Sequence, residues 1–182
     1  MHLDEVEFKA KDGRIFTLRS LGGHDAQAAI AFMATMYDDS PYLSRYGDEW
    51  SMSEEDERLY LDRAHLAERR LMVGSFREGA LIAIADFFPV GSVSKMAHRC
   101  SCSIAVARAF SGIGIGTAMM EILIDEARAV GCEQMELEVV SENAAAVALY
   151  KKLGFVAYGL LPRGFKNRDG SFHDLLSMLL TL

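Results

Sequence analysis

A glycine-rich loop in the second half of the chain constrains the possible folds most strongly. It reads Ser111-Gly112-Ile113-Gly114-Ile115-Gly116-Thr117 and joins a short apolar run, residues 99–106, to the most regular amphipathic stretch, residues 113–130. Glycines at alternate positions allow a tight turn and leave backbone N–H groups unshielded by side chains. At a helix N-terminus such amides and the helix dipole form a site for an anion such as a pyrophosphate. The same spacing is equally compatible with a flexible entry turn.

This glycine loop differs from the two best-known phosphate-binding motifs. It lacks the Gly-Lys-Ser/Thr ending of a P-loop, which argues against hydrolysis of nucleoside triphosphates. It also lacks a third glycine in the register of the dinucleotide-binding motif, and no β-α-β unit opens the chain. Both of these functions are therefore poor interpretations.

Hydrophobic periodicity places the glycine loop within an alternation of strands and helices. Residues 14–19 alternate polar and apolar side chains, which is typical of a half-buried strand. Asp25 and Ser53 are suited to cap the helices that follow them. The order predicts a three-layer α+β fold with a mixed sheet and helices on both faces. The expected strands cover residues 14–19, 70–76, 80–88, 99–106, 135–140, 155–160 and 175–182, and the expected helices cover residues 26–36, 53–67, 113–130 and 144–153.

Composition narrows the class of protein. Apolar residues make up 51% of the 182 residues, and no repeat divides the chain, so one domain over residues 1–182 is expected. The net charge of −7 disfavours binding to nucleic-acid phosphates. No apolar run approaches the roughly 20 residues of a membrane span, and residues 1–11 lack the apolar core of a signal peptide. Three cysteines without matching metal ligands indicate core thiols in a reducing compartment, so a cytoplasmic location is expected.

Two motifs together resemble one known family. The run from Ile104-Ala105-Val106 through the glycine loop resembles the acetyl-CoA-binding motif of the GNAT N-acetyltransferase superfamily. A second motif follows at the spacing of that family: Leu137-Glu138-Val139, then Asn143, Tyr150 and Lys152-Leu153-Gly154-Phe155. The pair covers residues 99–158 and is specific where either motif alone is not.

The resemblance implies an acetyl-CoA-dependent N-acetyltransferase with a GNAT-like fold, in which two central strands splay apart. Acetyl-CoA is then the cosubstrate, and a primary amine of a small molecule or peptide attacks it directly in a ternary complex. Tyr150 is expected near the sulfur, where its phenol can protonate the leaving thiolate. Ser111 stands where the family usually has Arg or Gln, a loss for which Lys152 or Arg108 could compensate. The expected cofactor-binding residues are Ile104, Ala105, Val106, Ser111, Gly112, Gly114, Gly116, Thr117, Asn143 and Tyr150.

The general base is less obvious than the acid. Many members of the superfamily carry a glutamate near the position of Ser101, and this strand has no carboxylate. Glu138 is the expected substitute, whereas Glu136 on the same strand face is more consistent with a solvated or helix-covered surface. His98 and His173 are further candidates, because histidine is a common general base in enzymes.

Two further segments bear on what the protein binds, and a second function is also compatible with the sequence. Residues 38–57 mix carboxylates with aromatic side chains, which could hold an ammonium group but are equally compatible with a solvated acidic loop. Residues 175–182 could pair across a homodimer or lie in the core. The alternative function is a non-catalytic acyl-CoA-binding or sensor domain of the same fold, which Ser111 and the missing carboxylate leave open.

Overall fold

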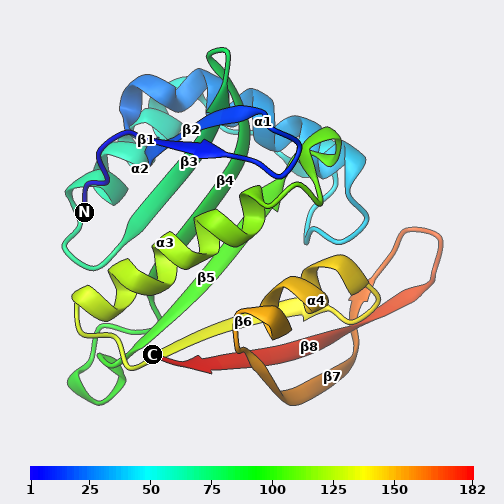
Figure 1. The fold of residues 1–182 in the computed structure, drawn as a ribbon. Coiled ribbons are helices and arrows are strands. Elements are labelled where there is room, and N and C mark those ends of the chain that lie inside the picture. The colour runs from blue at the N-terminus through cyan, green and yellow to red at the C-terminus, as the bar shows by residue number, and fades with distance from the viewer.

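An eight-stranded sheet runs through the whole chain (Figure 1). The computed structural model describes residues 1–182, and the strands are ordered β1-β2-β3-β4-β5-β6-β8-β7. All neighbouring strands pair antiparallel except β5 and β6, which are parallel, so the predicted mixed, mostly antiparallel sheet is confirmed. The strands are β1 (Val6–Lys9), β2 (Ile15–Ser20), β3 (Leu71–Arg77), β4 (Ala80–Pro89), β5 (Arg99–Val106), β6 (Gln134–Val140), β7 (Val156–Lys166) and β8 (Phe172–Thr181).

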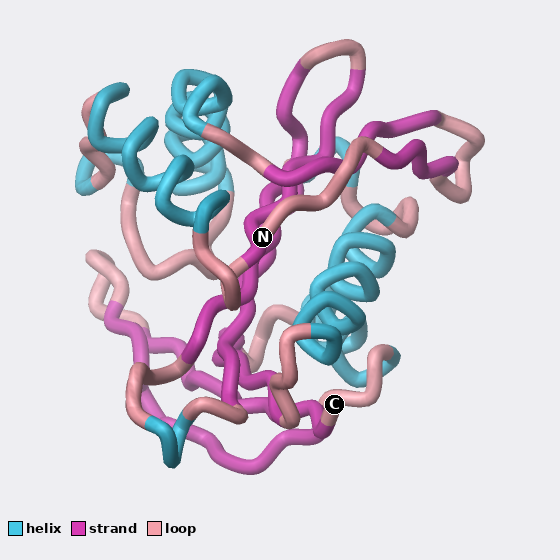
Figure 2. Tube along the Cα trace, turned by 90° about the vertical axis from the view of Figure 1, so that its left-hand side faces the viewer, coloured by secondary structure: helices cyan, strands magenta, loops and turns pink.

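Helices cover both faces of this sheet (Figure 2). α1 (Ala26–Asp39) and α2 (Glu54–Leu66) lie on one face, and α3 (Ile115–Ala129) lies on the other. α4 (Ala144–Lys152) packs into the same apolar cluster as α3. The three predicted layers are therefore confirmed. None of the helices is long and apolar enough to cross a membrane.

The larger apolar cluster lies between the sheet and α3. The helix contributes Met119, Leu123 and Ala127, which are spaced by four residues along one face and fully buried. A smaller cluster lies under α1 and α2 and includes Leu61 and Met72. Since α3 contacts β3, β4 and β5, packing fixes the position of the central strand β5.

The two central strands β5 and β6 separate after a short paired segment. Residues 99–101 pair with residues 134–136, and the pairing ends there. β5 stays bonded to β4 as far as Val106, and β6 stays bonded to β8 as far as Val140, so the strands diverge (Figure 1). This separation, hereafter the split, leaves one edge of each strand without a partner. It is the splay that the family resemblance implies.

An ion pair lies at the closed end of the split. Arg99 donates to Glu136 from both Nε and Nη2, and the Nη2–Oε2 distance is 2.7 Å. Gln134 Nε2 donates to the same carboxylate at 3.1 Å. The Arg99 guanidinium holds the pKa of the Glu136 carboxyl below its usual range. Glu136 therefore joins β5 to β6.

Several element boundaries differ from those predicted. β1 was missed because it is an edge strand of four residues, three of them exposed, and the alternation in Val6-Glu7-Phe8-Lys9 is too short to indicate a strand by itself. β7 continues past Pro162 to Lys166 at the other edge of the sheet, where a proline without an N–H group is tolerated. β8 lies between β6 and β7, and Met178 is fully buried, so residues 175–182 belong to the core rather than to an edge.

Two helix starts also differ in their chemistry. α3 begins at Ile115 because Gly114 has a φ of 103°, a left-handed conformation that a right-handed helix cannot include. Asp25 precedes α1 but makes no side-chain cap, because its carboxylate accepts from Arg19 and from the Gly22 amide instead. Ser53 does cap α2, accepting from the Asp56 amide at 3.1 Å.

Glu136→Gln is expected to lower the free energy of unfolding by about 1 kcal/mol near neutral pH, because it removes a charge-assisted link between β5 and β6. A carboxyl with a lowered folded pKa stabilises fully above its unfolded pKa of about 4.3 and loses that contribution as pH falls through the folded pKa. In urea unfolding, the difference from the wild type should therefore shrink as the pH is lowered from about 7 to about 3.

Glu121→Gln is the matched control, because it neutralises an exposed carboxylate on α3 and should change stability by less than about 0.5 kcal/mol. A loss of stability in Glu136→Gln that is independent of pH would contradict the assigned role of the ion pair.

Candidate active site

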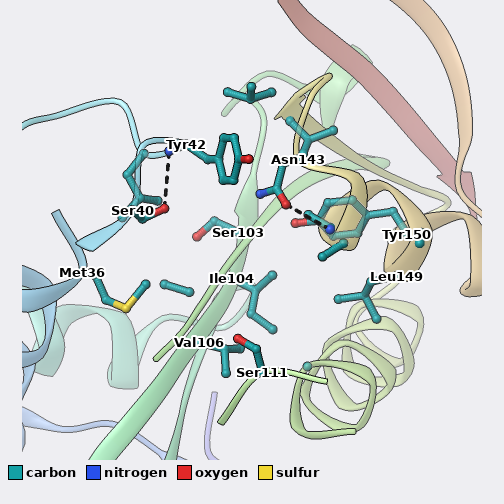
Figure 3. A pocket seen from close by; sticks show the side chains of 18 of the residues that line it. Met36, Ser40, Tyr42, Ser103, Ile104, Val106, Ser111, Asn143, Leu149 and Tyr150 are labelled. Carbon is teal, nitrogen blue, oxygen red and sulfur yellow. Dashed lines mark hydrogen bonds between the residues drawn. The ribbon is translucent and has the colours of Figure 1, made fainter. Parts of the chain in front are cut away.

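A cavity of about 650 Å³ occupies the split (Figure 3). β5 and β6 supply its two walls, the glycine loop and α4 line one side, and the end of α1 with the segment after it lines the other. All the residues that the resemblance assigned to the cofactor line this cavity: Ile104, Ala105, Val106, Ser111, Gly112, Gly114, Gly116, Thr117, Asn143 and Tyr150.

The glycine loop presents a row of free backbone donors. Gly112 and Gly114 have φ values of 79° and 103°, which residues other than glycine rarely adopt. The amides from Gly112 to Thr117 donate to no acceptor in the protein, and the last three belong to the first turn of α3. At Gly116 an added Cβ would lie 3.3 Å from Leu149 Cδ2, so glycine lets α4 approach closely. A row of this kind at a helix N-terminus attracts an anion.

Lysine side chains add positive charge beside the loop. Lys152 lines the cavity, whereas Arg108 does not. Lys11 also lines it, and the Lys11 amide donates to the Ile113 carbonyl at 3.0 Å, which ties the loop to the turn between β1 and β2. Sequence reasoning missed Lys11, because only the fold brings this turn to the loop.

The free edge of β5 and the side chain of Asn143 both face the cavity. Beyond Ser101, β5 bonds only to β4, so alternate peptide groups of residues 102–106 point into the split without a partner. Asn143 caps α4, its Oδ1 accepting from the Ala146 amide at 3.2 Å, and this leaves Nδ2 free to donate. An extended chain of amides can pair with such an edge as an added strand.

Tyr150 is a buried titratable group of the cavity wall. Its side chain is only 6% exposed and packs against Phe155, with 5.7 Å between the ring centroids. Burial raises the pKa of the Tyr150 phenol, because a phenolate there would lose its hydration. The hydroxyl is therefore protonated at neutral pH, which is the state required of an acid.

The two glutamates of β6 occupy different environments. Glu138 is exposed and lines the cavity, where Ser177 Oγ lies 3.5 Å from its Oε1. Glu136 lies at the closed end of the split in the ion pair with Arg99. Of the two, Glu138 alone can reach a bound acceptor.

The histidine candidates lie outside the cavity lining. His98 is beside the closed end of the split, in a separate surface hollow with Glu133. His173 Nδ1 is 3.5 Å from Glu142, and its ring lies edge-on to Tyr42 with 6.3 Å between the centroids. Neither ring lines the space beside Tyr150.

The cysteines behave as core residues, as the sequence predicts. Cys100, Cys102 and Cys132 are buried and free. Burial raises the pKa of the Cys100 and Cys102 thiols, so neither supplies a thiolate nucleophile.

The segment proposed from the sequence to hold an ammonium group, residues 38–57, does reach the far side of the cavity, but not through its carboxylates. Asp38 and Asp39 are exposed and do not line it. Asp48 and Glu49 pair with Arg168 of the β7–β8 turn, at 2.7 and 3.6 Å. The carboxylates of residues 38–56 are thus solvated or paired at the surface, while Glu57 is buried outside the cavity lining, and the segment contributes other side chains to the site. The lining on this side includes Met36, Ser40, Tyr42, Leu43, Ser44, Ser103 and Phe165.

Comparison of the sequence with protein families gives one match over most of the chain. The model described as "Acetyltransferase (GNAT) family" matches residues 30–155. An L-amino acid N-acyltransferase of Escherichia coli, MnaT, is 27% identical over 157 residues, which cover 86% of this chain and 90% of the relative. The ribosomal protein bS18-alanine N-acetyltransferase of Escherichia coli is 38% identical over 80 residues, or 44% of this chain and 53% of that protein.

Comparison with solved structures gives the same fold. A GNAT-family acetyltransferase from Streptococcus pneumoniae aligns with a TM-score of 0.87 at 24% identity, over 92% of this chain and 99% of that one. An acetyltransferase from Salmonella typhimurium, solved with acetyl-CoA, aligns with a TM-score of 0.81 at 23% identity, over 92% and 94% of the two chains.

Gly112→Ala is expected to raise the Kd for acetyl-CoA about tenfold, because a left-handed φ costs an L-residue about 1–2 kcal/mol and the loop amides will turn to relieve it. Isothermal titration calorimetry measures the change. Gly79→Ala is the matched control, since Gly79 has a φ of 82° and, like Gly112, has no atom within 4 Å of an added Cβ. The control should lose similar stability and keep its affinity; equal affinities in the two variants would argue against the role of the loop.

Proposed function

The chain belongs to the GNAT acetyltransferase family, and from this premise we propose how its cavity transfers an acetyl group from acetyl-CoA to an amine. The observation that carries the proposal is the row of free amides from Gly112 to Thr117 at one end of a cavity that crosses the split. This end suits an anionic cofactor, and the differently lined far side leaves room for an acceptor.

Different residues of the cavity bind different parts of the cofactor. The amides of the glycine loop hold the pyrophosphate, with Thr117 and Ser111 adding hydroxyl groups and Lys11 and Lys152 adding positive charge. The edge formed by residues 104–106 pairs with the pantetheine arm, toward which Asn143 directs Nδ2. Acetyl-CoA supplies a thioester carbonyl that is reactive toward amines.

Two side chains handle protons in this scheme. Glu138 takes a proton from the incoming ammonium, because only a neutral amine has a lone pair with which to attack. Tyr150 gives its phenolic proton to the sulfur of the leaving thiolate, and the raised pKa of the phenol keeps that proton available. Unpaired N–H groups of β5 polarise the carbonyl oxygen. The attack is direct and forms no covalent enzyme intermediate.

The acceptor that we propose is a primary amine of a small molecule or peptide. The two curated relatives described above are named for amino acids and for a protein N-terminal alanine, which supports this class. The net charge of −7 and the exposed carboxylate of Glu138 favour an ammonium over a nucleic acid or an anionic lipid surface.

Domain organisation and location follow from the same observations. We propose that residues 1–182 make up one GNAT domain, since a single sheet includes all eight strands. We also propose a cytoplasmic location, which the three free, buried cysteines support.

Tyr150→Phe is expected to lower kcat about 100-fold while the Kd for acetyl-CoA stays within about threefold, because the lost hydroxyl acts on the leaving group. The assay follows release of the coenzyme A thiol with L-methionine, tyramine and an alanine-initiated pentapeptide as acceptors. Tyr158→Phe, which removes an exposed phenol on β7, is the control and should match the wild type.

Each failure in this assay has a separate meaning. A wild-type protein that binds acetyl-CoA but releases no thiol with any acceptor would be a non-catalytic acyl-CoA-binding domain. A normal kcat in Tyr150→Phe, with an active wild type, would remove Tyr150 from the acid role and leave acetyl transfer standing.

We further propose that the protein forms a homodimer through β7. This strand is an edge of the sheet, and Val156, Tyr158, Leu160 and Leu161 on it are between 53% and 61% exposed. An exposed apolar edge with unpaired peptide groups favours pairing with another strand. In a dimer, β7 of one protomer can pair with β7 of its partner.

Leu160→Lys is expected to convert this dimer to a monomer, because a charge on an edge strand opposes edge-to-edge pairing. Sedimentation equilibrium measures the mass. Val93→Lys places the same charge at a residue that is 58% exposed but lies outside the strands, and it should leave the mass unchanged. A monomeric wild type, or a dimeric Leu160→Lys variant, would contradict the proposed interface.

A further inference from the structure

A carboxylate outside both sequence motifs lies directly behind the acceptor side of the cavity. Asp86 is on β4, opposite Ser103 of β5 in the strand register, and its side chain is only 5% exposed. Ser103 Oγ donates to Asp86 Oδ1 at 2.6 Å, while Ser103 itself is exposed and lines the cavity. Figure 3 shows Ser103 on the side from which Ser40 and Tyr42 approach. One hydroxyl therefore connects a buried carboxylate to the space in which an acceptor would lie.

The position of this pair along β5 is specific. Ser101 is the last residue of β5 that pairs with β6, so Ser103 stands where the split opens. The next residue, Ile104, begins the edge assigned to the pantetheine arm. Ser101 itself does not line the cavity. Although β5 has no carboxylate of its own, the neighbouring strand places one against it.

An ion pair alone does not account for this arrangement. Arg70 Nη2 lies 3.5 Å from Asp86 Oδ2, which is a longer contact than the bond from Ser103. The Arg70 guanidinium has a second partner in Tyr60, since it lies 4.6 Å from the ring centroid and donates to the hydroxyl. The shorter contact of Asp86 is thus the one with Ser103, a residue that lines the cavity.

We propose that Ser103 contacts the attacking nitrogen of the acceptor and passes the proton that leaves this nitrogen to Asp86. Because the Ser103 hydrogen is committed to Asp86, Oγ presents its lone pairs to the cavity and accepts a hydrogen bond from the amine. Asp86 acts as a positioning residue and proton acceptor behind Ser103. The inference rests on the proposed acetyl transfer and adds to it the route of the second proton.

The two protons that an ammonium acceptor loses then leave by different routes. Glu138 takes the first proton before the attack. As the nitrogen–carbon bond forms, an N–H proton passes to Ser103 Oγ while the hydroxyl proton passes to Asp86. The carbon–sulfur bond breaks, and Tyr150 protonates the sulfur. Glu138 and Asp86 afterwards release their protons to solvent and Tyr150 regains one, so all three residues return to their starting states.

The surroundings of Asp86 suit a proton acceptor. Burial raises the pKa of the Asp86 carboxyl, and the Ser103 hydroxyl and the Arg70 guanidinium oppose this rise. The other titratable group beside it is the Cys102 thiol, which burial keeps protonated. Tyr60 acts on Asp86 only through Arg70. Burial therefore makes the Asp86 carboxylate a better proton acceptor, and the nearest cation, Arg70, is too distant to cancel this effect.

The test measures kcat against pH for Ser103→Ala, Ser103→Thr and Asp86→Asn, with the best acceptor from the panel used for Tyr150. Ser103→Ala and Asp86→Asn are each expected to lower kcat about 100-fold with the KM for acetyl-CoA within about threefold. Ser103→Thr, which keeps the hydroxyl, should retain most of the activity. The double variant should be no slower than Asp86→Asn, because the two residues act as a unit. The acid limb in Asp86→Asn should differ from that of the wild type, because protonation of residue 86 no longer affects kcat.

A second measurement needs no turnover. In a carbon-13 NMR titration of the Asp86 carboxyl, Ser103→Ala should raise the pKa relative to the wild type, because the hydroxyl donates to the charged form. Ser75→Ala is the control for both measurements, since it removes a buried hydroxyl of β3 that has no partner.

The outcomes separate this inference from the proposed function. If the wild type transfers acetyl groups and the kcat of Ser103→Ala is within about twofold of the wild-type kcat, the inference about Ser103 and Asp86 is overturned while the proposed function stands. The same holds if the acid limb of Asp86→Asn is unchanged from that of the wild type. Because Ser103 is exposed, its variants give this answer even if Asp86→Asn does not fold. A wild type inactive with every acceptor overturns the proposed function and the inference together.

Discussion

The site depends on the early separation of β5 from β6. The two strands share only the pairing of residues 99–101 with residues 134–136, and each is then held by its other neighbour, β4 or β8. Peptide groups buried without partners are costly, so the edges that face the split require hydrogen bonds from elsewhere. A ligand with its own amide groups can supply them. The separation that interrupts the sheet is thus what makes it able to bind.

Charge is distributed along the cavity in a way that matches two different ligands. Free amides, Lys11 and Lys152 gather at the end near the N-terminus of α3. Glu138 lines the cavity wall, and Asp86 stands behind Ser103 on the acceptor side. The net charge of −7 therefore does not oppose an anionic cofactor, because the local field at the glycine loop comes from the backbone rather than from the overall charge.

Burial gives the titratable groups of the site their separate roles. It raises the pKa of both Tyr150 and Asp86, which keeps a proton on the phenol and makes the carboxylate a better proton acceptor. Glu138 is exposed and lines the cavity. Glu136, close to it along β6, is withdrawn from the chemistry by Arg99. Neighbouring carboxylates thus differ in function because their surroundings differ.

The sequence by itself determined the parts of this protein that depend on local chemistry. The glycine loop, the capping Ser53 and the bounds of β5 were predictable, because backbone conformation, helix capping and strand patterning depend on residues close together in the chain. Asn143 and Tyr150 were expected only through the family resemblance, and both line the cavity. Sequence reasoning preferred Glu138 to Glu136, but only tertiary structure shows that Glu136 is held in an ion pair, since Arg99 reaches it across the paired ends of β5 and β6. Tertiary structure also decided the places of Lys11 and Asp86, which carry no signal in their own segments. Asp86 is one acid in an apolar strand, and it meets Ser103 through cross-strand register, a relation between distant residues that no local pattern encodes.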